Sequence, residues 1–430
     1  MPSRTVERPV AGVVRGLELL RPLRGTPVPH FRAKVRDLVV VASSSRGGSS
    51  MLAELLRSSP QLLHLRAELN PLLRLVGLDH PHSGTGSDAL EAAHWHGLPP
   101  RSRALFEAEL ALDAGSPGTG VENLAVDAAW RLVVQWPGRD LDPLDLVRTA
   151  EAVLDRAGAM DREPGLDGDL PRFARALIGM AGVNPWYYDL PGRPSGSRPP
   201  TGPPGDVLLE EPPFVLPRPW RPANDHDLAT KPLVIKTPGN VHRLGFLRAV
   251  FPNARLRVLH LTRNPAASIN GLVDGWLHHG FHAYRLDEPL RIAGYADARP
   301  ADRHWWKFDL PPRWPAYTAA ALPRVCAHQW VSSHRAVLAH GADHTVRFED
   351  LISGPAARAD AVERIADWLG IPFDVPLRRA ATDGIAATVA TAAPRPGRWR
   401  AREDEIRSVL SADVLAMAER LGYARGDHWI

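Results

Sequence analysis

The most constraining feature of this 430-residue chain is a buried-strand pattern that runs directly into a loop of small residues and then into a helix pattern. Residues 37–42 (DLVVVA) form a short Val-rich run, as in a strand covered on both faces of a parallel sheet. The loop 43–50 reads SSSRGGSS, and residues 51–56 (MLAELL) predict a helix that ends near Pro60. Strand, loop and helix in this order form the first unit of a doubly wound α/β fold.

Three further apolar runs predict strands of the same sheet, at residues 232–236 (PLVIK), 256–261 (LRVLHL) and 345–348 (TVRF). Helical patterns lie between or after them, at about 240–250, 265–278, 323–339 and 356–369. Strands that alternate with helices predict a parallel sheet with helices on both faces. We therefore expect a three-layer α/β fold with a central, mostly parallel sheet, and 44% hydrophobic residues suffice for its core.

Residues from about 75 to 230 break this alternation. They contain four helical patterns and then a Pro-rich run, with the helices near 101–113, 122–134, 143–157 and 170–181. We interpret 75–230 as a helical and Pro-rich insertion that covers the site, because segments beside an open α/β sheet commonly set substrate choice. Within it, the Pro- and Gly-rich residues 191–206 favour a flexible linker, while the aromatic residues of 186–188 and Trp220 indicate that its flanks pack.

Residues 1–36 are predicted to form a basic helical extension. Apolar residues at helical spacing predict a surface helix over 11–24. Residues 1–40 carry eight Lys or Arg and three Asp or Glu, so the formal net charge of +4 arises at this end of the chain. This is not the dense basic block of a nucleic-acid-binding tail, and we expect no nucleic-acid partner. Residues 37–430 then form a single domain that contains the insertion.

The loop after the first strand is suited to bind an anion. Its backbone N–H groups lie at the positive end of the helix dipole, and Gly47 and Gly48 let the backbone approach a ligand closely. Ser49 and Ser50 add hydroxyl donors, and Arg46 adds a full charge. A Walker loop would carry a Lys before the hydroxyls, so a P-loop-type kinase is disfavoured. A tight turn capped by serine is the alternative that needs no ligand.

Two further cations are predicted at the same edge of the sheet. The strand 256–261 delivers Arg263 at its carboxyl end, and Pro265 can start the next helix. The strand 232–236 ends in Lys236, one of only four lysines among the 52 Lys and Arg residues. Ligands of open α/β sheets bind at the carboxyl ends of the strands. The loop and the two cations together therefore predict a site for a polyanionic nucleotide.

In five segments the chain resembles the sulfotransferases that use 3′-phosphoadenosine 5′-phosphosulfate (PAPS). The matching segments are 46–50 (RGGSS), 236–238 (KTP), 263–265 (RNP), 347–351 (RFEDL) and 369–373 (LGIPF). Each segment alone is a weak signal, but together they occur in the family's order and at predicted strand ends. The resemblance implies a P-loop NTPase-like fold and a catalytic domain, and it leaves the insertion without a counterpart.

The resemblance also implies which residues bind PAPS. By position, Arg46, Gly47, Gly48, Ser49 and Ser50 would hold the 5′-phosphosulfate. Arg263 would hold the 3′-phosphate. Family members usually place a second donor, a serine, eight residues after that arginine, where this chain has Gly271; Ser268, one helical turn earlier, is the substitute. The C-terminal G-x-W-[KR] segment of the family is matched by Gly397, Arg398 and Trp399.

Sulfuryl transfer resembles phosphoryl transfer, for which positioning and charge stabilisation supply most of the catalysis. Lys236 and Arg46 are the candidates to stabilise the leaving 5′-phosphate. The acceptor hydroxyl also needs a base within hydrogen-bond reach. Some family members place a histidine two residues after the lysine, where this chain has Pro238, and others use a glutamate after the loop helix, which Glu68 matches. Further candidates for the base are Glu210, Glu211, His64 and His242.

The sequence thus predicts a PAPS-dependent sulfotransferase that acts on a hydroxyl of a small molecule or glycoconjugate. A P-loop-type nucleotide kinase and a non-catalytic nucleotide-binding protein are the alternatives. The histidine pairs lack a third ligand at a recognisable spacing, so we expect no metal. No apolar run is long enough for a membrane helix, and the single Cys326 excludes an internal disulfide. We expect a cytoplasmic protein.

Overall fold

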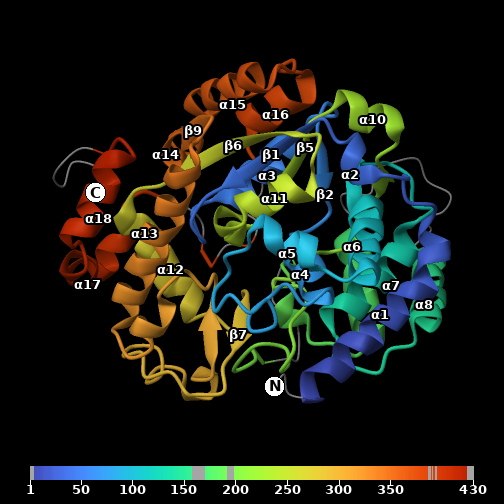
Figure 1. Ribbon diagram of the computed structural model, residues 1–430, viewed down its shortest axis with the longest axis horizontal. Coiled ribbons are helices and arrows are strands. Elements are labelled where there is room, and N and C mark those ends of the chain that lie inside the picture. The colour runs from blue at the N-terminus through green and yellow to red at the C-terminus, as the bar shows by residue number, and fades with distance from the viewer. Residues whose placement is uncertain are drawn as a thin grey trace.

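The computed structural model describes residues 4–156, 170–190, 198–385, 389, 391–392 and 395–423. At its centre lies a seven-stranded sheet in the order β4-β3-β2-β5-β1-β6-β9 (Figure 1). Five neighbouring strands are parallel: β2 (Leu63–Leu65), β5 (Leu233–Lys236), β1 (Asp37–Ala42), β6 (Arg255–Thr262) and β9 (His344–Arg347). The predicted α/β fold with a central, mostly parallel sheet is confirmed, and each of the four predicted strands is present.

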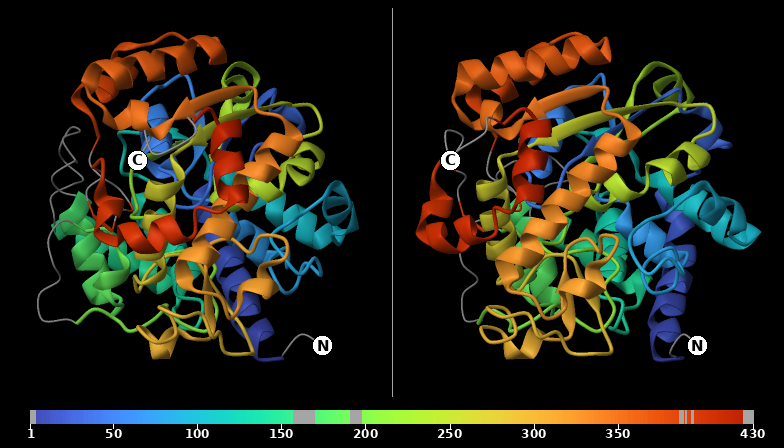
Figure 2. Two further views of the ribbon diagram at one scale, coloured as in Figure 1. Left: turned by 90° about the vertical axis from the view of Figure 1, so that its left-hand side faces the viewer. Right: turned by 60° about the vertical axis from the view of Figure 1, so that its left-hand side comes forward.

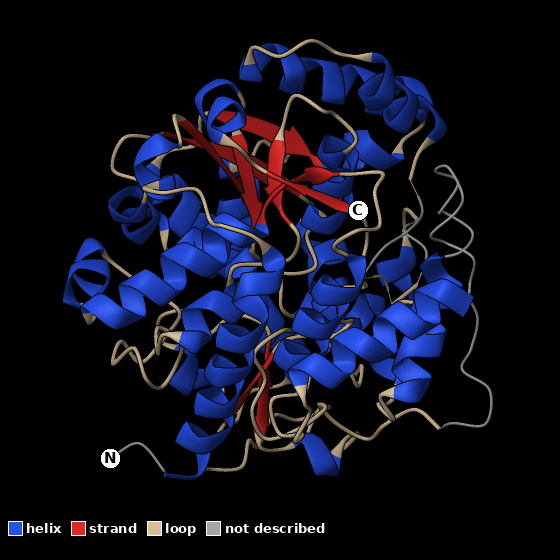
Figure 3. Ribbon diagram, turned by 90° about the vertical axis from the view of Figure 1, so that its right-hand side faces the viewer, coloured by secondary structure: helices blue, strands red, loops and turns tan. Residues whose placement is uncertain are grey.

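Strand β1 is buried on both faces because its side chains alternate between two hydrophobic clusters. Val39 and Val41 pack with α3 (Ser49–Arg57), α14 (Phe348–Ile352), α15 (Pro355–Leu369) and α16 (Val375–Asp383). Leu38 and Val40 pack on the opposite face, in the cluster that includes α4 (Asn70–Leu75) and α11 (Leu244–Val250). Successive side chains of a strand point to opposite faces of the sheet, so a strand between two helical layers needs an apolar residue at every position. Figure 3 shows the sheet enclosed by helices.

The segment 75–230 contributes helices and also two strands. Its helices are α5 (Ala92–Gly97), α6 (Pro100–Asp113), α7 (Leu124–Gln135), α8 (Pro143–Arg156), α9 (Leu170–Met180) and α10 (Asp225–Thr230). Strand β3 (Ala114–Pro117) pairs antiparallel with β2, and β4 (Trp220–Pro222) pairs antiparallel with β3. The segment therefore extends the central sheet at one edge. Of the predicted linker 191–206, residues 191–197 lie outside the described residues. Tyr187 and Trp220 on its flanks are buried.

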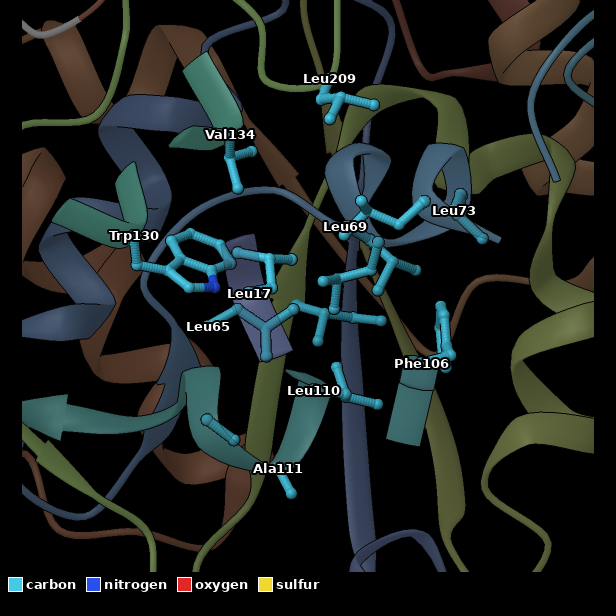
Figure 4. Packing of buried hydrophobic residues seen from close by; sticks show 14 of the residues in the cluster. Leu17, Leu65, Leu69, Leu73, Phe106, Leu110, Ala111, Trp130, Val134 and Leu209 are labelled. Carbon is cyan, nitrogen blue, oxygen red and sulfur yellow. The ribbon is translucent and has the colours of Figure 1, made fainter. Parts of the chain in front are cut away.

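The N-terminal helix α1 (Arg4–Arg24) packs on α7 and α8 and is part of the largest core. Leu17 and Leu20 are fully buried, and Leu17 lies in one cluster with Leu65 of β2 and Trp130 of α7 (Figure 4). A short connection with α2 (Phe31–Lys34) leads from α1 into β1. Because α1 shares its core with the insertion, the division into a 1–36 extension and a 37–430 domain stays a prediction.

The C-terminal half adds a helical layer beside β6 and a second, two-stranded sheet. The helices α12 (Pro265–Trp276) and α13 (Leu322–His340) pack together, with α17 (Glu403–Ser408) and α18 (Ala412–Arg420) against them (Figure 2). The small sheet consists of β7 (Ala283–Arg285) and β8 (Trp305–Lys307). Short 3₁₀ turns complete the chain at Pro185–Tyr187, Pro238–His242, Pro300–Asp302, Trp314–Tyr317 and Arg398–Arg402. None of the helices in the described part of the chain has the length and apolar character of a membrane span.

Candidate active site

A cavity of about 350 Å³ opens where β1, β5 and β6 end. Strand β1 lies between β5 and β6 in register, with Val41 beside Lys236 and Ala42 beside His260. The segments that follow the three strands therefore converge on one place. The cavity wall includes most of the predicted phosphate loop and both strand-end cations: Ser45, Arg46, Gly48, Ser49, Ser50, Lys236 and Arg263.

The loop before α3 has a backbone that only a few residues adopt. Arg46 has φ 62° and Gly48 has φ 102°, both in the left-handed region. A Cβ at Gly48 would overlap the ring of Phe348, so this position requires glycine for space as well as for φ. Gly48 is also the N-cap of α3 and supplies no side-chain acceptor to the first turn. The start of α3 thus presents backbone donors, with Ser49 and Ser50 beside them, to the cavity.

The side chain of Arg46 carries an incompletely compensated charge. Its Nη1 donates to the carbonyl of Val389 at 2.7 Å, and its guanidinium lies 4.3 Å from the ring centroid of Phe281. Its Nε is buried and has no partner among the described residues. Burial and, next, the charge of Arg263 lower the pKa of Arg46 to about 10, although Asp274 acts in the opposite direction. An anion in the cavity would compensate this buried positive charge.

Arg263 lies beside Arg46 and completes the cationic side of the cavity. Its Nη1 donates to the backbone carbonyl of Arg46 at 3.1 Å, and its guanidinium lies 4.6 Å from the ring centroid of Phe348. Burial lowers the pKa of Arg263 despite the opposite effect of Glu349, and Arg398 lowers it further. The cation cluster of this side is therefore built from side chains 217 residues apart in sequence.

The C-terminal segment also reaches this side of the cavity. Arg398 and Trp399 line it, and Gly397 lies at the start of the same turn without lining the cavity. Arg398 pairs with Asp274 of α12 at 2.7 Å. Ser268 does not line the cavity, since its side chain is buried and its Oγ lies 3.5 Å from the carbonyl of Arg263. Gly271, one turn further along α12, does line it.

Lys236 and Glu68 form an ion pair in the wall of the cavity. Lys236 ends β5, and Glu68 lies in the turn after β2, which Thr237 fixes by accepting a hydrogen bond from the Leu69 backbone N–H at 2.8 Å. Burial raises the pKa of Glu68, but Lys236 and the hydrogen bond with Glu211 outweigh it, and the pKa is lowered. Glu68 is therefore an ionised carboxylate at neutral pH beside a lysine at a strand end.

The other candidate bases differ in their surroundings. Glu210 and Glu211 both line the cavity, but Glu210 is almost fully buried and accepts hydrogen bonds from Arg131, Gln135 and Val215, whereas Glu211 lies close to Glu68. Burial and Arg57 hold the pKa of His64 well below its usual value. His242 is buried and does not line the cavity. Of these four, Glu211 is the carboxyl group that lies next to the Lys236–Glu68 pair.

The end of the cavity beside β2 is lined by charged residues that sequence reasoning did not identify; Arg57 donates to the carbonyl of Leu65 at the end of β2, and β5 and β1 separate β2 from β6, which precedes Arg263. Glu54 and Arg57 come from α3, and Arg218 comes from the Pro-rich run. Arg57 and Arg218 both pair with Glu54, the latter at 3.2 Å, and Arg66 at the end of β2 pairs with Asp127. Ser50, Glu54 and Arg57 are spaced four and three residues apart, so helical spacing from the loop could have indicated Glu54 and Arg57. Nothing in the sequence pairs Arg218 with them.

Within the described ranges, no group of three or more His, Cys, Asp or Glu is arranged to hold a metal ion. The histidines near residues 278–282 have other neighbours. His279 Nε2 lies 3.0 Å from the carbonyl of Trp186, and His282 contacts Arg74.

A family model described as the sulfotransferase family matches residues 38–309, which is more than half of the chain. Among solved structures, the sulfotransferase domain from the curacin biosynthetic pathway is 13% identical and covers 91% of this chain and 99% of its own, with a TM-score of 0.37. The sulfotransferase domain from the Synechococcus PCC 7002 olefin synthase is 15% identical and covers 91% and 96%, with a TM-score of 0.35. No curated protein matches the chain.

Proposed function

This chain belongs to the sulfotransferase family, and we propose that it transfers the sulfuryl group of PAPS to a hydroxyl of a small molecule or glycoconjugate. The observation that carries the proposal is the convergence of Arg46 and Arg263 on one cavity that also holds the start of α3. Arg263 donates to the backbone carbonyl of Arg46, and within the described residues neither guanidinium forms an ion pair, which favours a ligand with two separated anionic groups.

The residues on this side of the cavity fit a bisphosphorylated nucleotide. We assign the 5′-phosphosulfate to Arg46, the loop backbone and the hydroxyls of Ser49 and Ser50, where helix start and full charge coincide. The 3′-phosphate is assigned to Arg263 and Arg398, and Trp399 adds an aromatic surface. Four further assignments follow from sequence position: Gly47 and Gly48 shape the loop, Gly397 shapes the C-terminal turn, and Ser268 acts through its contact with the carbonyl of Arg263.

Glu68 and Lys236 are assigned to the transfer step. The bond between sulfur and the bridging oxygen breaks as the bond from sulfur to the acceptor oxygen forms, and the electron pair stays on the 5′-phosphate. Glu68 takes the proton of the acceptor hydroxyl, because it is ionised and lines the cavity. Lys236 and Arg46 stabilise the charge of the leaving phosphate. Removal of one such preorganised donor lowers kcat roughly 10²–10³-fold.

The alternatives make different predictions about the ligand. A P-loop-type kinase would bind ATP in preference to 3′,5′-ADP, and the absence of a lysine before Ser49 argues against it. A non-catalytic binding protein would bind 3′,5′-ADP and release no product with any acceptor. Both alternatives can be excluded with the same purified protein.

The test is an incubation with PAPS labelled on sulfur and a panel of hydroxyl acceptors, followed by separation of labelled products. The proposal expects a labelled sulfate ester and release of 3′,5′-ADP by the wild type, and loss of both in Arg263→Ala. Arg148→Ala is the matched control, since Arg148 lies on α8, is two-thirds exposed, and pairs with Asp145 one helical turn away. Equal labelling in Arg263→Ala and Arg148→Ala would contradict the proposal.

A further inference from the structure

Glu68 and Glu211 are two neighbouring carboxyl groups that would repel each other if both were ionised. Both line the cavity, and the two carboxyl groups lie close enough to act on each other's pKa. Lys236 Nζ donates to Glu68 Oε1, while Glu68 Oε2 is buried and has no donor partner among the described residues. An ionised carboxylate offers only acceptors, so two carboxylates in contact require a proton between them.

The surroundings of the two carboxyl groups indicate which one keeps the proton. Lys236 pairs with Glu68 and stabilises the negative charge there. On its other side Glu211 meets His282, whose Nδ1 lies 3.5 Å from Glu211 Oε2. Burial, Arg74 and other nearby cations hold the pKa of His282 well below its usual value, so this ring is neutral. Negative charge is therefore stabilised more at Glu68 than at Glu211.

Two cations, Lys236 and Arg74, act on Glu211. Arg74 of α4 lies behind His282, with Nη2 2.7 Å from the ring, and Nη1 donates to the carbonyl of Leu208 at 2.7 Å. Burial and the charge of Glu68 raise the pKa of Glu211 well above its usual value, although Lys236 and Arg74 act in the opposite direction. The geometry and the balance of charges thus agree.

We propose that Glu211 carries a proton at neutral pH and donates it as a hydrogen bond to Glu68. This makes Glu211 a positioning residue for proton removal from the acceptor, and it rests on the proposed function of Glu68. The proton of Glu211 keeps Glu68 ionised and holds its carboxylate at a fixed angle beside Lys236. The segment that carries Glu211 belongs to the Pro-rich run, so the insertion supplies part of the reaction machinery.

The proton count of one turnover can be written for the pair. Before transfer, Glu211 holds one proton and Glu68 holds none. As the acceptor oxygen bonds to sulfur, its proton moves to Glu68, and both carboxyl groups are then neutral. Lys236 loses its anionic partner at that moment and becomes free to face the leaving phosphate. Release of one proton to water after product departure restores the starting state.

The first experiment measures the protonation state of the Glu68–Glu211 pair in the absence of turnover. Infrared difference spectra at pH 7 compare the wild type with Glu211→Gln, which keeps the shape and a neutral donor. We expect a carbonyl band of a protonated carboxyl group that is present in the wild type and absent in the variant. Glu54→Gln is the control in the same cavity, because Arg57 and Arg218 lower the pKa of Glu54 to about 2 despite its burial. That control should remove no such band.

The second experiment measures the role of Glu211 in transfer by the release of 3′,5′-ADP at a series of pH values. We expect the wild type to lose activity as alkaline pH removes the proton of Glu211, and Glu211→Gln to retain activity without that alkaline loss. Glu211→Ala should lower kcat about 10- to 100-fold with KM for PAPS changed less than about twofold. Circular dichroism and thermal unfolding establish that Glu211→Ala is folded.

The outcomes separate this inference from the proposed function. No band lost in Glu211→Gln would overturn the inference, even where the wild type makes sulfate ester. Equal loss of kcat in Glu211→Gln and Glu211→Ala, with an unchanged pH profile, would also overturn it, since a merely structural role gives that result. If the band is lost in Glu211→Gln but the wild type is inert toward PAPS, the proposed function is contradicted, while the protonation of Glu211 is supported.

Discussion

The arginines at the two ends of the cavity have different partners. At the end near Arg263, the guanidiniums of Arg46 and Arg263 contact backbone carbonyls and aromatic rings, and Arg46 keeps a buried Nε without a partner. At the opposite end, Arg57 and Arg218 share the carboxylate of Glu54. Among the residues that the structure describes, the two guanidiniums of the first end form no ion pair and retain positive charge for a polyanion, whereas the second end pairs its two guanidiniums with one carboxylate. Under the proposed function, the first end binds the nucleotide and the second binds the acceptor, and we call them the nucleotide end and the acceptor end.

The boundary between the two ends is the Lys236–Glu68 pair, where both charges are present side by side. Glu211 adds a neutral carboxyl group to this boundary, as inferred above. The proposed transfer of a sulfuryl group from a nucleotide to an uncharged hydroxyl fits this order of environments: cations without an ion pair, a Lys–Glu pair, and ion-paired guanidiniums. Changes at each position should therefore affect different measurements.

The largest expected effect is that of Glu68→Gln. It should lower turnover about 10²–10⁴-fold, because the acceptor hydroxyl loses its base. The affinity for 3′,5′-ADP should stay within about threefold, since Glu68 belongs to the boundary and not to the nucleotide end. Steady-state rates and calorimetric titration measure the two quantities on one preparation. Loss of nucleotide affinity equal to the loss of rate would remove the distinction between the ends.

Arg263→Ala should weaken 3′,5′-ADP binding about 10- to 100-fold, the loss of one or two charge-assisted hydrogen bonds. Arg218→Ala removes a guanidinium from the acceptor end, where it is paired with Glu54, and should change the dissociation constant less than about twofold. Titration of both variants with 3′,5′-ADP makes the comparison. Similar losses in the two variants would mean that the nucleotide does not distinguish the ends.

Gly48→Ala should destabilise the fold by about 1–3 kcal/mol, since a left-handed φ of 102° and overlap with the Phe348 ring both oppose a Cβ. Gly47 is a poor control, because a Cβ there would lie 2.8 Å from the Ser44 carbonyl oxygen. Gly84→Ala is the better control: it has φ 73°, and nothing lies within 4 Å of its Cβ. Thermal unfolding should show a larger loss of stability for Gly48→Ala than for Gly84→Ala. An equal loss of stability would mean that the overlap with Phe348 has no effect beyond that of the positive φ.

The smallest expected effect concerns acid stability. Arg57 and Arg218 lower the pKa of Glu54 to about 2 against the effect of burial, so its folded pKa lies below the unfolded value. Its contribution is present above the unfolded pKa and is lost as pH falls from about 4.5 to about 2. After allowance for partial exposure we expect about 1 kcal/mol. Glu54→Gln should lack this acid-dependent loss in denaturant titrations; an identical pH dependence would refute the pairing.

The nucleotide end was predictable from sequence because each of its main elements is local. A Val-rich strand leads into RGGSS, and Arg263 directly follows the next strand in the sheet, so strand order alone brings the two together. Ser268 shows the limit of this reasoning. Its position one turn from Gly271 suggested a shared face, but its side chain turns to the carbonyl of Arg263 and is buried.

The acceptor end was not predictable because it depends on contacts between distant segments. The edge strands β3 (AGSP) and β4 (WRP) are too short and too poor in apolar residues to show a period of two. Arg218 meets Glu54 across 164 residues, and Glu211 was only one of several candidate bases until its neighbours were known. The family resemblance likewise has no motif in the insertion that supplies these residues.

The most direct test of the account is a structure of the protein with 3′,5′-ADP bound. The account predicts that the 3′-phosphate contacts Arg263 and that the 5′-phosphate lies at the start of α3 beside Arg46, Ser49 and Ser50, with Lys236 facing the open side of the 5′-phosphate. A nucleotide bound outside this cavity, or one whose two phosphates contact neither Arg46 nor Arg263, would contradict it.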